Sequence, residues 1–285
     1  MTELEFDNRF TRVIEQALYE DIGMGDVTTD AIVSEHEIGK AEILIKENGV
    51  LAGIDVAELV FKTVDNTFSF QKIISDGDIA IKGTTAATLE GSLANILRTE
   101  RVALNFLQRM SGIATLTRKF VKAVEHTKAK ITDTRKTIPT LRAFDKLAVC
   151  IGGGVNHRFG LDDMVLIKDN HIIAAGGITN AIKRCEFFLS EHKLNLNIEV
   201  ETKNIDEVKE ALHHNFIHRI MLDNFSIEEM KSAVEIINHQ VEVEASGNVS
   251  LETVKQIAET GVDIISIGAL THSPKALDIS LNILS

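Results

Sequence analysis

Residues 152–171 bring four basic side chains close together in the sequence, and their placement suggests a surface that binds an anion. His157 and Arg158 precede a short apolar run at 164–167, and Lys168 and His171 follow it. A solvated helix surface would scatter such charges, whereas a strand with cations on both sides can present them at one place. The pattern therefore predicts one wall of a site for carboxylates or phosphates.

Side chains able to do chemistry recur at the ends of six predicted strands. The strands are expected within 130–135, 164–169, 197–202, 219–224, 241–246 and 263–269. Near their ends stand Arg135, Lys168, Glu201, Asp223, Ser246 and Gly268, which are 33, 33, 22, 23 and 22 residues apart. The early strands would supply cations, the middle strands carboxylates and the late strands small residues.

Each group of strand-end residues suits a different part of a substrate. Guanidinium groups clamp carboxylates with paired hydrogen bonds, so a diacid would suit the cations, which are Arg135, His157, Arg158 and Lys168. Glu201 and Asp223 have no cation beside them in the sequence and suit ribose hydroxyls or Mg²⁺. Main-chain N–H groups at 246–247 and 268–269 could hold a phosphate. Singly, each residue fits a solvated rim charge or a salt bridge equally well; the argument for function is their joint placement.

The elements that must position these residues form a repeating pattern in the second part of the chain. The six strands alternate with amphipathic helices, which demands parallel strands with right-handed crossovers. Asn204, Ser226 and Ser250 are expected to cap three of the helices. No GxGxxG turn follows any strand, which argues against a dinucleotide fold. The sequence therefore predicts an open α/β barrel of six to seven parallel strands, with its active site at their carboxyl ends.

The first part of the chain has a different pattern, typical of an α+β domain. A helix is expected over 7–20 and an irregular loop over 21–30, followed by short strands in 41–54 and 68–93 with a helix at 55–64 between them. Helical sequence at 97–126, broken near 111–115, leads into the barrel. The predicted domains are 1–108, 109–274 and a C-terminal segment, 275–285, that packs back toward the first.

Composition excludes several classes of protein. The chain has 285 residues, 44% of them hydrophobic and 25% charged, as expected of a globular protein. Its net charge of -12 argues against nucleic-acid binding, and no apolar run suggests a membrane span or a secretory signal. We therefore expect a cytoplasmic protein without nucleic-acid or membrane partners. The two cysteines, Cys150 and Cys185, have neither metal-ligand nor disulfide spacing and are expected to be buried thiols.

Eight stretches of the sequence together resemble one family, the nicotinate-nucleotide pyrophosphorylases, also called quinolinate phosphoribosyltransferases. They are EDIGMGDVTTD, ERVALNFLQRMSGIAT, DTRKTIPTLR, KLAVCIGGGVNHRFGLDDMVLIKDNH, IEVE, IMLDNFS, VEVEASGN and GVDIISIGALTHSPKALDISL, and they span nearly the whole chain. The resemblance implies an α/β N-terminal domain on an open barrel. It also implies transfer of phosphoribosyl from phosphoribosyl pyrophosphate (PRPP) to quinolinate with decarboxylation, giving nicotinate mononucleotide, pyrophosphate and CO₂ for de novo NAD synthesis.

The resemblance also assigns roles to residues. It places quinolinate against Arg135, His157, Arg158 and Lys168, completed by Arg101 from the partner subunit of a homodimer or larger assembly. It places PRPP against Lys136, Glu201, Asp223, Ser246, Gly247, Gly268 and His272. Catalytic work would fall to Lys136, Lys168, Glu201 and Asp223, with Mg²⁺ near the two carboxylates, directly or through water. One departure is Thr140, where the family usually has glycine, and it is expected to tighten a turn without removing a ligand.

Three alternatives remain open from the sequence. A related transferase family associated with molybdenum transport shares the fold and acts on a different base, although a monocarboxylate would not need so many cations. A barrel lyase could use Lys168 as a Schiff-base amine. That mechanism needs a desolvated, uncharged lysine, whereas neighbouring Asp169 and a bound diacid favour the charged form. The third alternative is a binding barrel without catalytic activity.

Overall fold

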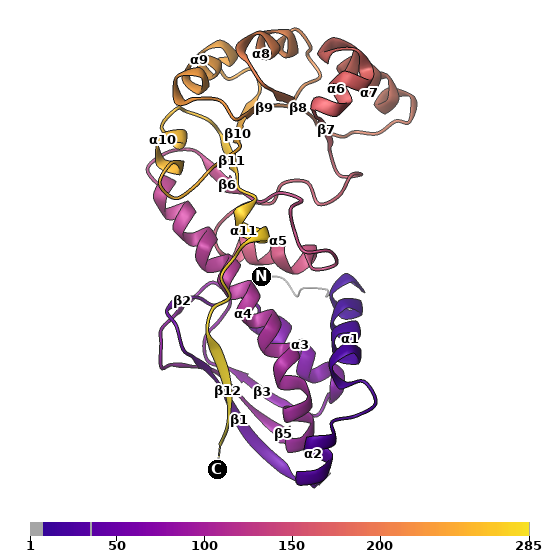
Figure 1. Ribbon diagram of the computed structural model, residues 1–285, viewed down its shortest axis with the longest axis vertical. Helices are drawn as coiled ribbons and strands as arrows, with labels where there is room; N and C mark the ends of the chain where they lie inside the picture. Colours follow the sequence, from indigo (N-terminus) through magenta and orange to yellow (C-terminus); the bar gives the residue numbers. More distant parts are fainter. Residues whose placement is uncertain (1–7, 35, 285) are drawn as a thin grey trace. The chain divides into compact units, whose positions relative to one another are not determined.

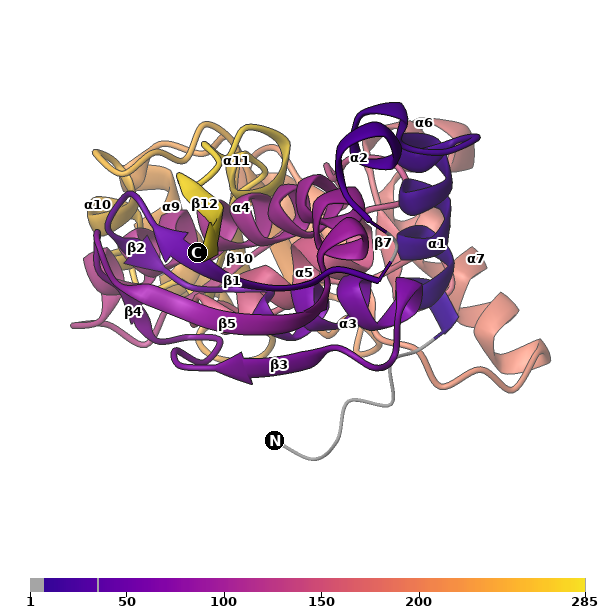
Figure 2. The same ribbon diagram turned by 90° about the horizontal axis from the view of Figure 1, so that it is seen from below.

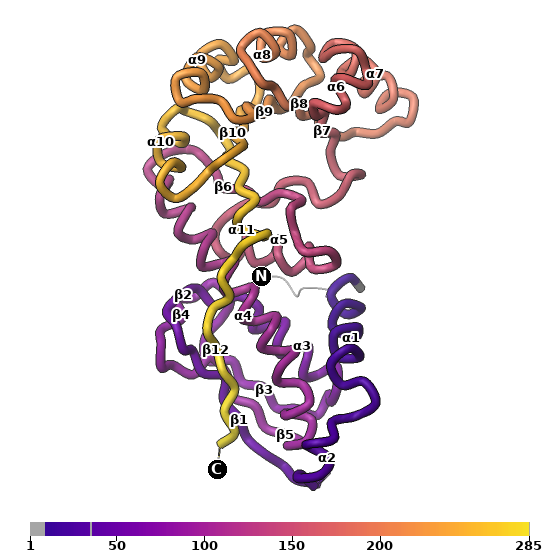
Figure 3. The backbone as a smooth tube through the Cα atoms, viewed as in Figure 1, coloured from indigo at the N-terminus to yellow at the C-terminus, as the bar shows by residue number. Residues whose placement is uncertain are grey.

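A computed structural model describes residues 8–34 and 36–284, which divide into two compact units. The first unit contains residues up to 118 together with 137–153 and 269–285, and the second contains 119–136 and 154–268. The backbone course of both units can be followed in Figure 3. In the described part of the chain, no helix is both long enough and apolar enough to cross a membrane.

The first unit is built on a four-stranded antiparallel sheet in the order β12-β1-β5-β3. Its strands are β1 (Ile38–Ile45), β3 (Ser69–Lys72), β5 (Thr85–Ser92) and β12 (Ile279–Leu284), three of which lie side by side in Figure 2. A small ladder joins β2 (Gly49–Val50) to β4 (Ile79–Ala80). In β1, alternate residues Ala41, Ile43 and Ile45 are fully buried, so one face of the sheet carries the core. The last strand, β12, pairs along β1 from Lys40↔Leu284 to Ile45↔Ile279.

The helices of the first unit largely follow the sequence pattern. They are α1 (Asn8–Ile22), α2 (Val27–Ile32), α3 (Ile54–Val64), most of α4 (Leu93–Val124), α5 (Arg142–Ile151) and α11 (Ala269–His272). The prediction of an irregular loop over 21–30 was wrong in its second half, because Asp26 caps α2. Its carboxylate accepts hydrogen bonds from the N–H groups of Thr28 and Thr29 at 3.1 Å each.

Helix α4 runs unbroken through 111–115, where the sequence predicted an interruption. Ser111 and Gly112 serve close packing there. The Ser111 hydroxyl lies 3.0 Å from the Ala52 nitrogen, and a Cβ on Gly112 would stand 2.2 Å from the Lys275 carbonyl oxygen. Small residues within a helical sequence can therefore indicate close packing against another segment as readily as they indicate the end of a helix.

The domain boundary predicted at residue 108 differs from the division into compact units. Residues 137–153, which include α5, group with the first unit although they follow the first barrel strand. Phe144 of α5 stacks on Phe106 of α4 with ring centroids 4.7 Å apart and meets Phe10 of α1 edge-on at 4.8 Å. Arg109 also pairs with the fully buried Asp145 through two hydrogen bonds of 2.8 Å. This packing explains why α5 belongs to the first unit.

The second unit contains the predicted parallel sheet, in the order β6-β11-β10-β9-β8-β7. Its strands are β6 (Lys130–Thr132), β7 (Val165–Ile167), β8 (Ile198–Thr202), β9 (Arg219–Asp223), β10 (Glu242–Ser246) and β11 (Ile264–Ser266). Figure 1 shows them as an arc, with helices on its outer side. Among the described residues no ladder joins β6 to β7, and only a parallel bridge from Thr132 to Val155 extends the sheet beyond β6. The predicted open barrel is confirmed.

The helices of the second unit are α6 (Asp169–Ala175), α7 (Ile178–Glu191), α8 (Ile205–Leu212), α9 (Ile227–Ile237) and α10 (Val254–Ala258). Asn204 and Ser226 cap α8 and α9 as predicted, accepting from the N–H groups of Glu207 and Glu229. The cap predicted at Ser250 was wrong, because residues 251–253 form turns and α10 begins only at Val254.

The cysteine prediction was also wrong. Cys150 is exposed, and Cys185 is only partly buried. Burial raises the pKa of the Cys185 thiol.

Thr140 occupies a backbone conformation that favours glycine. Its φ is +70°, and the Leu141 N–H donates to the Ile138 carbonyl at 3.2 Å, with Pro139 between them. Proline followed by a residue at positive φ is the pattern of a type II turn, in which glycine is preferred at the third position. A β-branched residue there is strained. The departure from the family's usual glycine thus has a conformational cost.

We expect Thr140→Gly to stabilise the protein by about 0.5–1 kcal/mol, because relief of this strain outweighs the added freedom of the unfolded chain. Thermal unfolding should show the midpoint rising by about 1–3 °C. Thr140→Ala keeps a Cβ atom at positive φ and is the control, for which a smaller gain is expected. A Thr140→Gly midpoint at or below that of the wild type would contradict the account of strain.

Candidate functional site

A cavity of about 310 Å³ opens in the second unit at the carboxyl ends of the strands. Five cations that the sequence singled out line it, namely Arg135, Lys136, His157, Arg158 and Lys168. Three further predicted residues, Glu201, Asp223 and Ser246, line the same cavity. Residues from separate βα units, spread over 112 positions from 135 to 246, therefore meet around one space.

Arg158 is the most buried of the arginine and lysine residues that line the cavity. It is only 8% exposed, and its Nη1 donates to the Met164 carbonyl oxygen at 3.0 Å. Burial and the nearby charge of Arg135 lower its pKa, so the two guanidinium groups lie near enough to repel each other. An anion bound between them would relieve this repulsion.

Lys168 lies beside a carboxylate, which the sequence did not suggest. Its Nζ is 3.4 Å from Glu201 Oε2, so Glu201, which has no cation beside it in the sequence, has one beside it in the fold. The Lys168 side chain is 47% exposed. It is therefore solvated, whereas a Schiff-base lyase needs a desolvated amine.

His171 does not belong to the cationic wall. Its Nδ1 accepts the N–H of Lys168 at 3.0 Å, which closes the first turn of α6. It lines a second cavity of about 400 Å³, whose other lining residues include Leu161, Met164 and Cys185. The four-residue wall predicted from 152–171 thus reduces to His157, Arg158 and Lys168.

The turns after β9 and β10 interlock at the side of the cavity formed by the late strands. Gly247 has φ +96°, and a Cβ there would stand 2.2 Å from the Asn224 Oδ1 atom. The same Oδ1 accepts from Asn248 Nδ2 at 3.0 Å, and Asn224 Nδ2 donates to Asp223 at 3.0 Å. Asn224 was missed by sequence reasoning, although an asparagine directly after a strand is a common left-handed turn residue; its φ is +59°.

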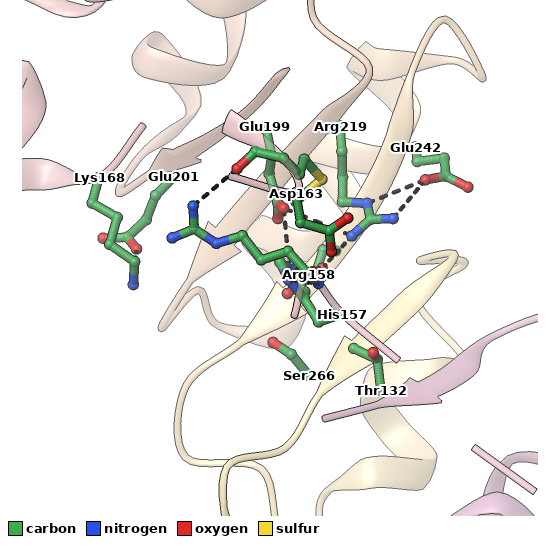
Figure 4. A network of polar contacts seen from close by, with 12 residues as sticks. Thr132, His157, Arg158, Asp163, Lys168, Glu199, Glu201, Arg219, Glu242 and Ser266 are labelled. Carbon is green, nitrogen blue, oxygen red and sulfur yellow. Dashed lines mark hydrogen bonds and ion pairs between the residues drawn. The ribbon is translucent and has the colours of Figure 1, made fainter. Parts of the chain in front are cut away.

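Below the strand ends, the interior of the barrel contains a buried network of charges (Figure 4). His157 Nε2 lies 3.1 Å from Glu199 and 3.3 Å from Glu244, and both carboxylates are fully buried. Arg219 Nη1 lies 3.0 Å from Glu244 and 3.7 Å from Glu199. These four side chains are called the buried network below. Barrel interiors are usually filled by branched apolar residues, so this one departs from the common pattern.

The pKa values within the buried network are shifted by burial and by mutual contact. Burial opposes a charge on the His157 ring, but the two carboxylates outweigh it and raise the pKa of His157 to about 9. At Glu244, contacts from His157, Ser266 and Arg219 outweigh burial and lower the pKa, whereas burial and the adjacent Glu244 raise the pKa of Glu199.

Two groups of residues could be considered as metal ligands. The Nε2 atom of His157 and carboxylate oxygens of Glu199 and Glu244 lie within 4.8 Å of one another. Arg219 already offsets charge at these carboxylates, and we interpret the group as an ion-pair network. Glu201 and Asp223 end neighbouring strands, line the cavity and offer only oxygen atoms, which suits Mg²⁺ better.

Four predicted residues do not line this cavity, and one of them, Gly247, directly follows the lining residue Ser246. Arg101 is exposed on α4 and His272 ends α11; both belong to the first unit. Gly268 is the last residue of the second unit, two positions after β11. The roles assigned to these residues stay predictions, as do those of the residues that line the cavity.

The fold and the site together define an α/β-barrel enzyme that acts on an anionic substrate at the carboxyl ends of its strands. Family models narrow this class. Residues 26–111 match the model described as "Quinolinate phosphoribosyl transferase, N-terminal domain", and residues 113–282 match the C-terminal domain of the same description. The chain belongs to the quinolinate phosphoribosyltransferase family.

Individual relatives agree over nearly the whole chain. The Nicotiana glauca protein "Quinolinate phosphoribosyltransferase [decarboxylating] 2, mitochondrial" is 49% identical over 95% of this chain and 81% of its own length. The rice protein "Nicotinate-nucleotide pyrophosphorylase [carboxylating], chloroplastic" is 50% identical, with 95% and 76% covered. Among solved structures, nicotinate-nucleotide pyrophosphorylase from Ehrlichia chaffeensis superposes with a TM-score of 0.91 at 45% identity, covering 96% of this chain and 98% of the other.

Proposed function

We propose that this protein transfers the phosphoribosyl group of PRPP to the ring nitrogen of quinolinate and removes one carboxylate, giving nicotinate mononucleotide, pyrophosphate and CO₂. This is a step of de novo NAD synthesis and makes the protein a pentosyltransferase. The observation that carries the proposal is the convergence of Arg135, Arg158 and Lys168 with Glu201 and Asp223 on one cavity. The names of the matched relatives support quinolinate over a different base.

Quinolinate binds in the cationic half of the cavity. Its two carboxylates face Arg135 and Arg158, whose mutual repulsion the diacid relieves, and Lys168 completes the charge balance. His157 forms part of the same wall. A dianion held between fixed guanidinium groups has its ring nitrogen oriented before the second substrate arrives, which lowers the entropic cost of the reaction.

PRPP binds on the side formed by the later strands. Glu201 and Asp223 accept hydrogen bonds from the ribose hydroxyls, and the turns at Ser246, Gly247 and Gly268 offer N–H groups to phosphate. Lys136 and His272 complete this half. Glu201 and Asp223 would hold Mg²⁺ directly or through water, and the ion would there supply positive charge near the pyrophosphate.

The reaction then needs no covalent enzyme intermediate. The C1′–O bond to pyrophosphate breaks while the quinolinate nitrogen bonds to C1′, and Lys136 helps to neutralise the anion that leaves. The alkylated nitrogen carries a positive charge beside C2. When the C2–carboxylate bond breaks, the electron pair stays on C2 next to this charge, CO₂ leaves, and C2 takes up one proton.

The proposal also covers the oligomeric state and the cellular location of the protein. The protein forms a homodimer in which Arg101, exposed on α4, completes the quinolinate pocket of the partner subunit. Its location is cytoplasmic. Relatives from Nicotiana glauca and rice carry mitochondrial or chloroplastic names, so location varies within the family.

A coupled product assay tests the proposal. Incubation with quinolinate, PRPP and Mg²⁺ should give nicotinate mononucleotide and CO₂ in equal amounts, because decarboxylation follows transfer to the same molecule. Nicotinate, which lacks the C2 carboxylate, should be a poor acceptor and serves as the control. Turnover of nicotinate at the rate of quinolinate, or no turnover of either, would overturn the proposal.

A further inference from the structure

The segment that carries His157 and Arg158 has little regular structure of its own. Between α5 and β7, where all residues are described, the segment pairs with a strand only at the bridge of Val155 to Thr132. There the Val155 N–H donates to the Ile131 carbonyl at 2.9 Å, and the Thr132 hydroxyl donates to the Val155 carbonyl at 3.0 Å. A segment held by so few main-chain bonds needs side-chain contacts to place a guanidinium reproducibly.

His157 makes contacts of this kind on three sides. Its main-chain N–H donates to Asp133 Oδ1 at 3.0 Å. Its ring Nδ1 accepts the N–H of Arg158 at 2.8 Å, and its Nε2 faces Glu199 and Glu244 at 3.1 and 3.3 Å. A doubly protonated ring could not accept the Arg158 N–H at Nδ1, so this geometry fits a ring whose one proton is on Nε2, where both partners are carboxylates.

The two carboxylates belong to different strands and are placed by the sheet. Glu199 stands in register with Arg219 on the neighbouring strand β9, and Glu244 lies on β10 on the other side of β9. Arg219 contacts both, and its guanidinium also donates to Glu242 at 2.9 and 3.1 Å. The carboxylates are therefore fixed by rigid strands, whereas the histidine that they hold comes from an irregular segment (Figure 4).

Burying two carboxylates, a guanidinium and an imidazole is costly, and an apolar interior of the same volume would often be at least as stable. Stability alone therefore does not account for the network. The position of the imidazole offers a functional reason for the network. His157 and Glu244 line the cavity, and Arg158 directly follows His157 in the chain.

We propose that Glu199 and Glu244, balanced by Arg219, are positioning residues: they hold the Nε2–H of His157 and, through its Nδ1, the main chain of Arg158, so that the Arg158 guanidinium stands in the quinolinate half of the cavity. This inference rests on the proposed function, since it assigns quinolinate to Arg158. It predicts an effect on one substrate only, because the buried network does not include the Lys136, Asp223 and Ser246 side of the cavity.

The test uses Glu199→Gln and Glu244→Gln, which keep volume and remove one charge each. We expect the KM for quinolinate to rise by about tenfold or more, while the KM for PRPP changes by less than about twofold. Glu242→Gln is the matched control, because Glu242 pairs with Arg219 and is 56% exposed. It does not contact His157 in the buried network, so both KM values should stay near those of the wild type. Equal rises for both substrates, or no change in either buried variant, would overturn the inference.

A double-mutant cycle separates positioning from general weakening of the fold. If the carboxylates act through the imidazole, Glu244→Gln should change the quinolinate KM much less in a His157→Gln background than in the wild type. Additive effects would mean that Glu244 acts by another route.

Nuclear magnetic resonance of ¹⁵N-labelled histidine gives a readout that does not depend on turnover, and its measurement on the wild type does not depend on whether the variants fold. In the wild type we expect a His157 Nε2–H signal protected from exchange with water; in any folded Glu199→Gln or Glu244→Gln protein it should shift and lose protection. An unprotonated or rapidly exchanging Nε2 in the wild type would refute the inference. A protected signal in a protein that does not turn over quinolinate would refute the proposed function instead.

Discussion

Replacing Arg135 with alanine should weaken quinolinate binding by about 30- to 150-fold while leaving PRPP binding within about threefold of the wild-type value. The range corresponds to about 2–3 kcal/mol, the usual worth of a hydrogen-bonded pair of charges that is poorly solvated. Arg135 lines the cavity beside Arg158 and faces it closely enough to lower the pKa of that guanidinium. Removing it leaves one carboxylate of the dianion without its partner. Calorimetric titration of each substrate separately measures the two dissociation constants.

Lys136→Ala is the matched control for this prediction. Lys136 is the next residue in the chain, lines the same cavity and is also a cation, but it is assigned to the pyrophosphate of PRPP. Its removal should weaken PRPP binding more than quinolinate binding. If both variants weakened both substrates equally, the cavity would act as a general anion trap, and the division into a quinolinate half and a PRPP half would be wrong.

The sequence predicts the barrel well, because the physical signals for it are local and repeated. Short strands rich in apolar residues recur along the second part of the chain, and most end in or just before a polar residue that the sheet brings to the same edge. The site residues at 135, 168, 201, 223 and 246 follow from that repetition alone, since carboxyl ends of neighbouring parallel strands must lie together.

The features that could not be predicted from the sequence depend on packing between segments that are far apart in the chain. Nothing local in 137–153 indicates that Phe144 stacks on Phe106, so the grouping of α5 with the first unit is invisible before folding. The unbroken course of α4 through Gly112 also depends on a distant segment. Glycine is needed there because the main chain of Lys275 leaves no room for a Cβ atom. Exposure of Cys150 likewise depends on which face of α5 is covered.

The sequence contains a pattern from which the two carboxylates of the buried network could have been predicted. Acidic residues alternate with apolar ones in IEVE at 198–201 and in VEVE at 241–244. Such alternation places Glu199 and Glu201, and likewise Glu242 and Glu244, on one face of their strands. The opposite face packs under helices through Val200 and Val243, so the acidic residues must face the barrel interior. Buried carboxylates require cations, and Arg219 and His157 are the residues that supply them.

Arg101→Ala should lower kcat/KM by about 100-fold or more. Pairing this chain with a partner chain that carries a different inactivating substitution should restore part of the activity. Arg101 is exposed on α4 in the first unit and is assigned to the quinolinate pocket of the partner subunit. A guanidinium donated across a dimer would add a further carboxylate contact and exclude water from the site. Steady-state kinetics of the single variant give the size of the loss.

Co-expression of Arg101→Ala and Lys136→Ala chains decides which subunit the arginine serves. A mixed dimer then contains one barrel with Lys136 intact that receives an intact Arg101 from its partner, and one barrel that lacks both. With random pairing half of the dimers are mixed, so about one quarter of the wild-type activity should return although each variant alone is nearly inactive. If Arg101 served its own barrel, neither site of a mixed dimer would be complete and no activity would return. Purifying the mixed dimer through two different affinity tags should raise the recovered activity to about one half, because each such dimer has one complete site out of two.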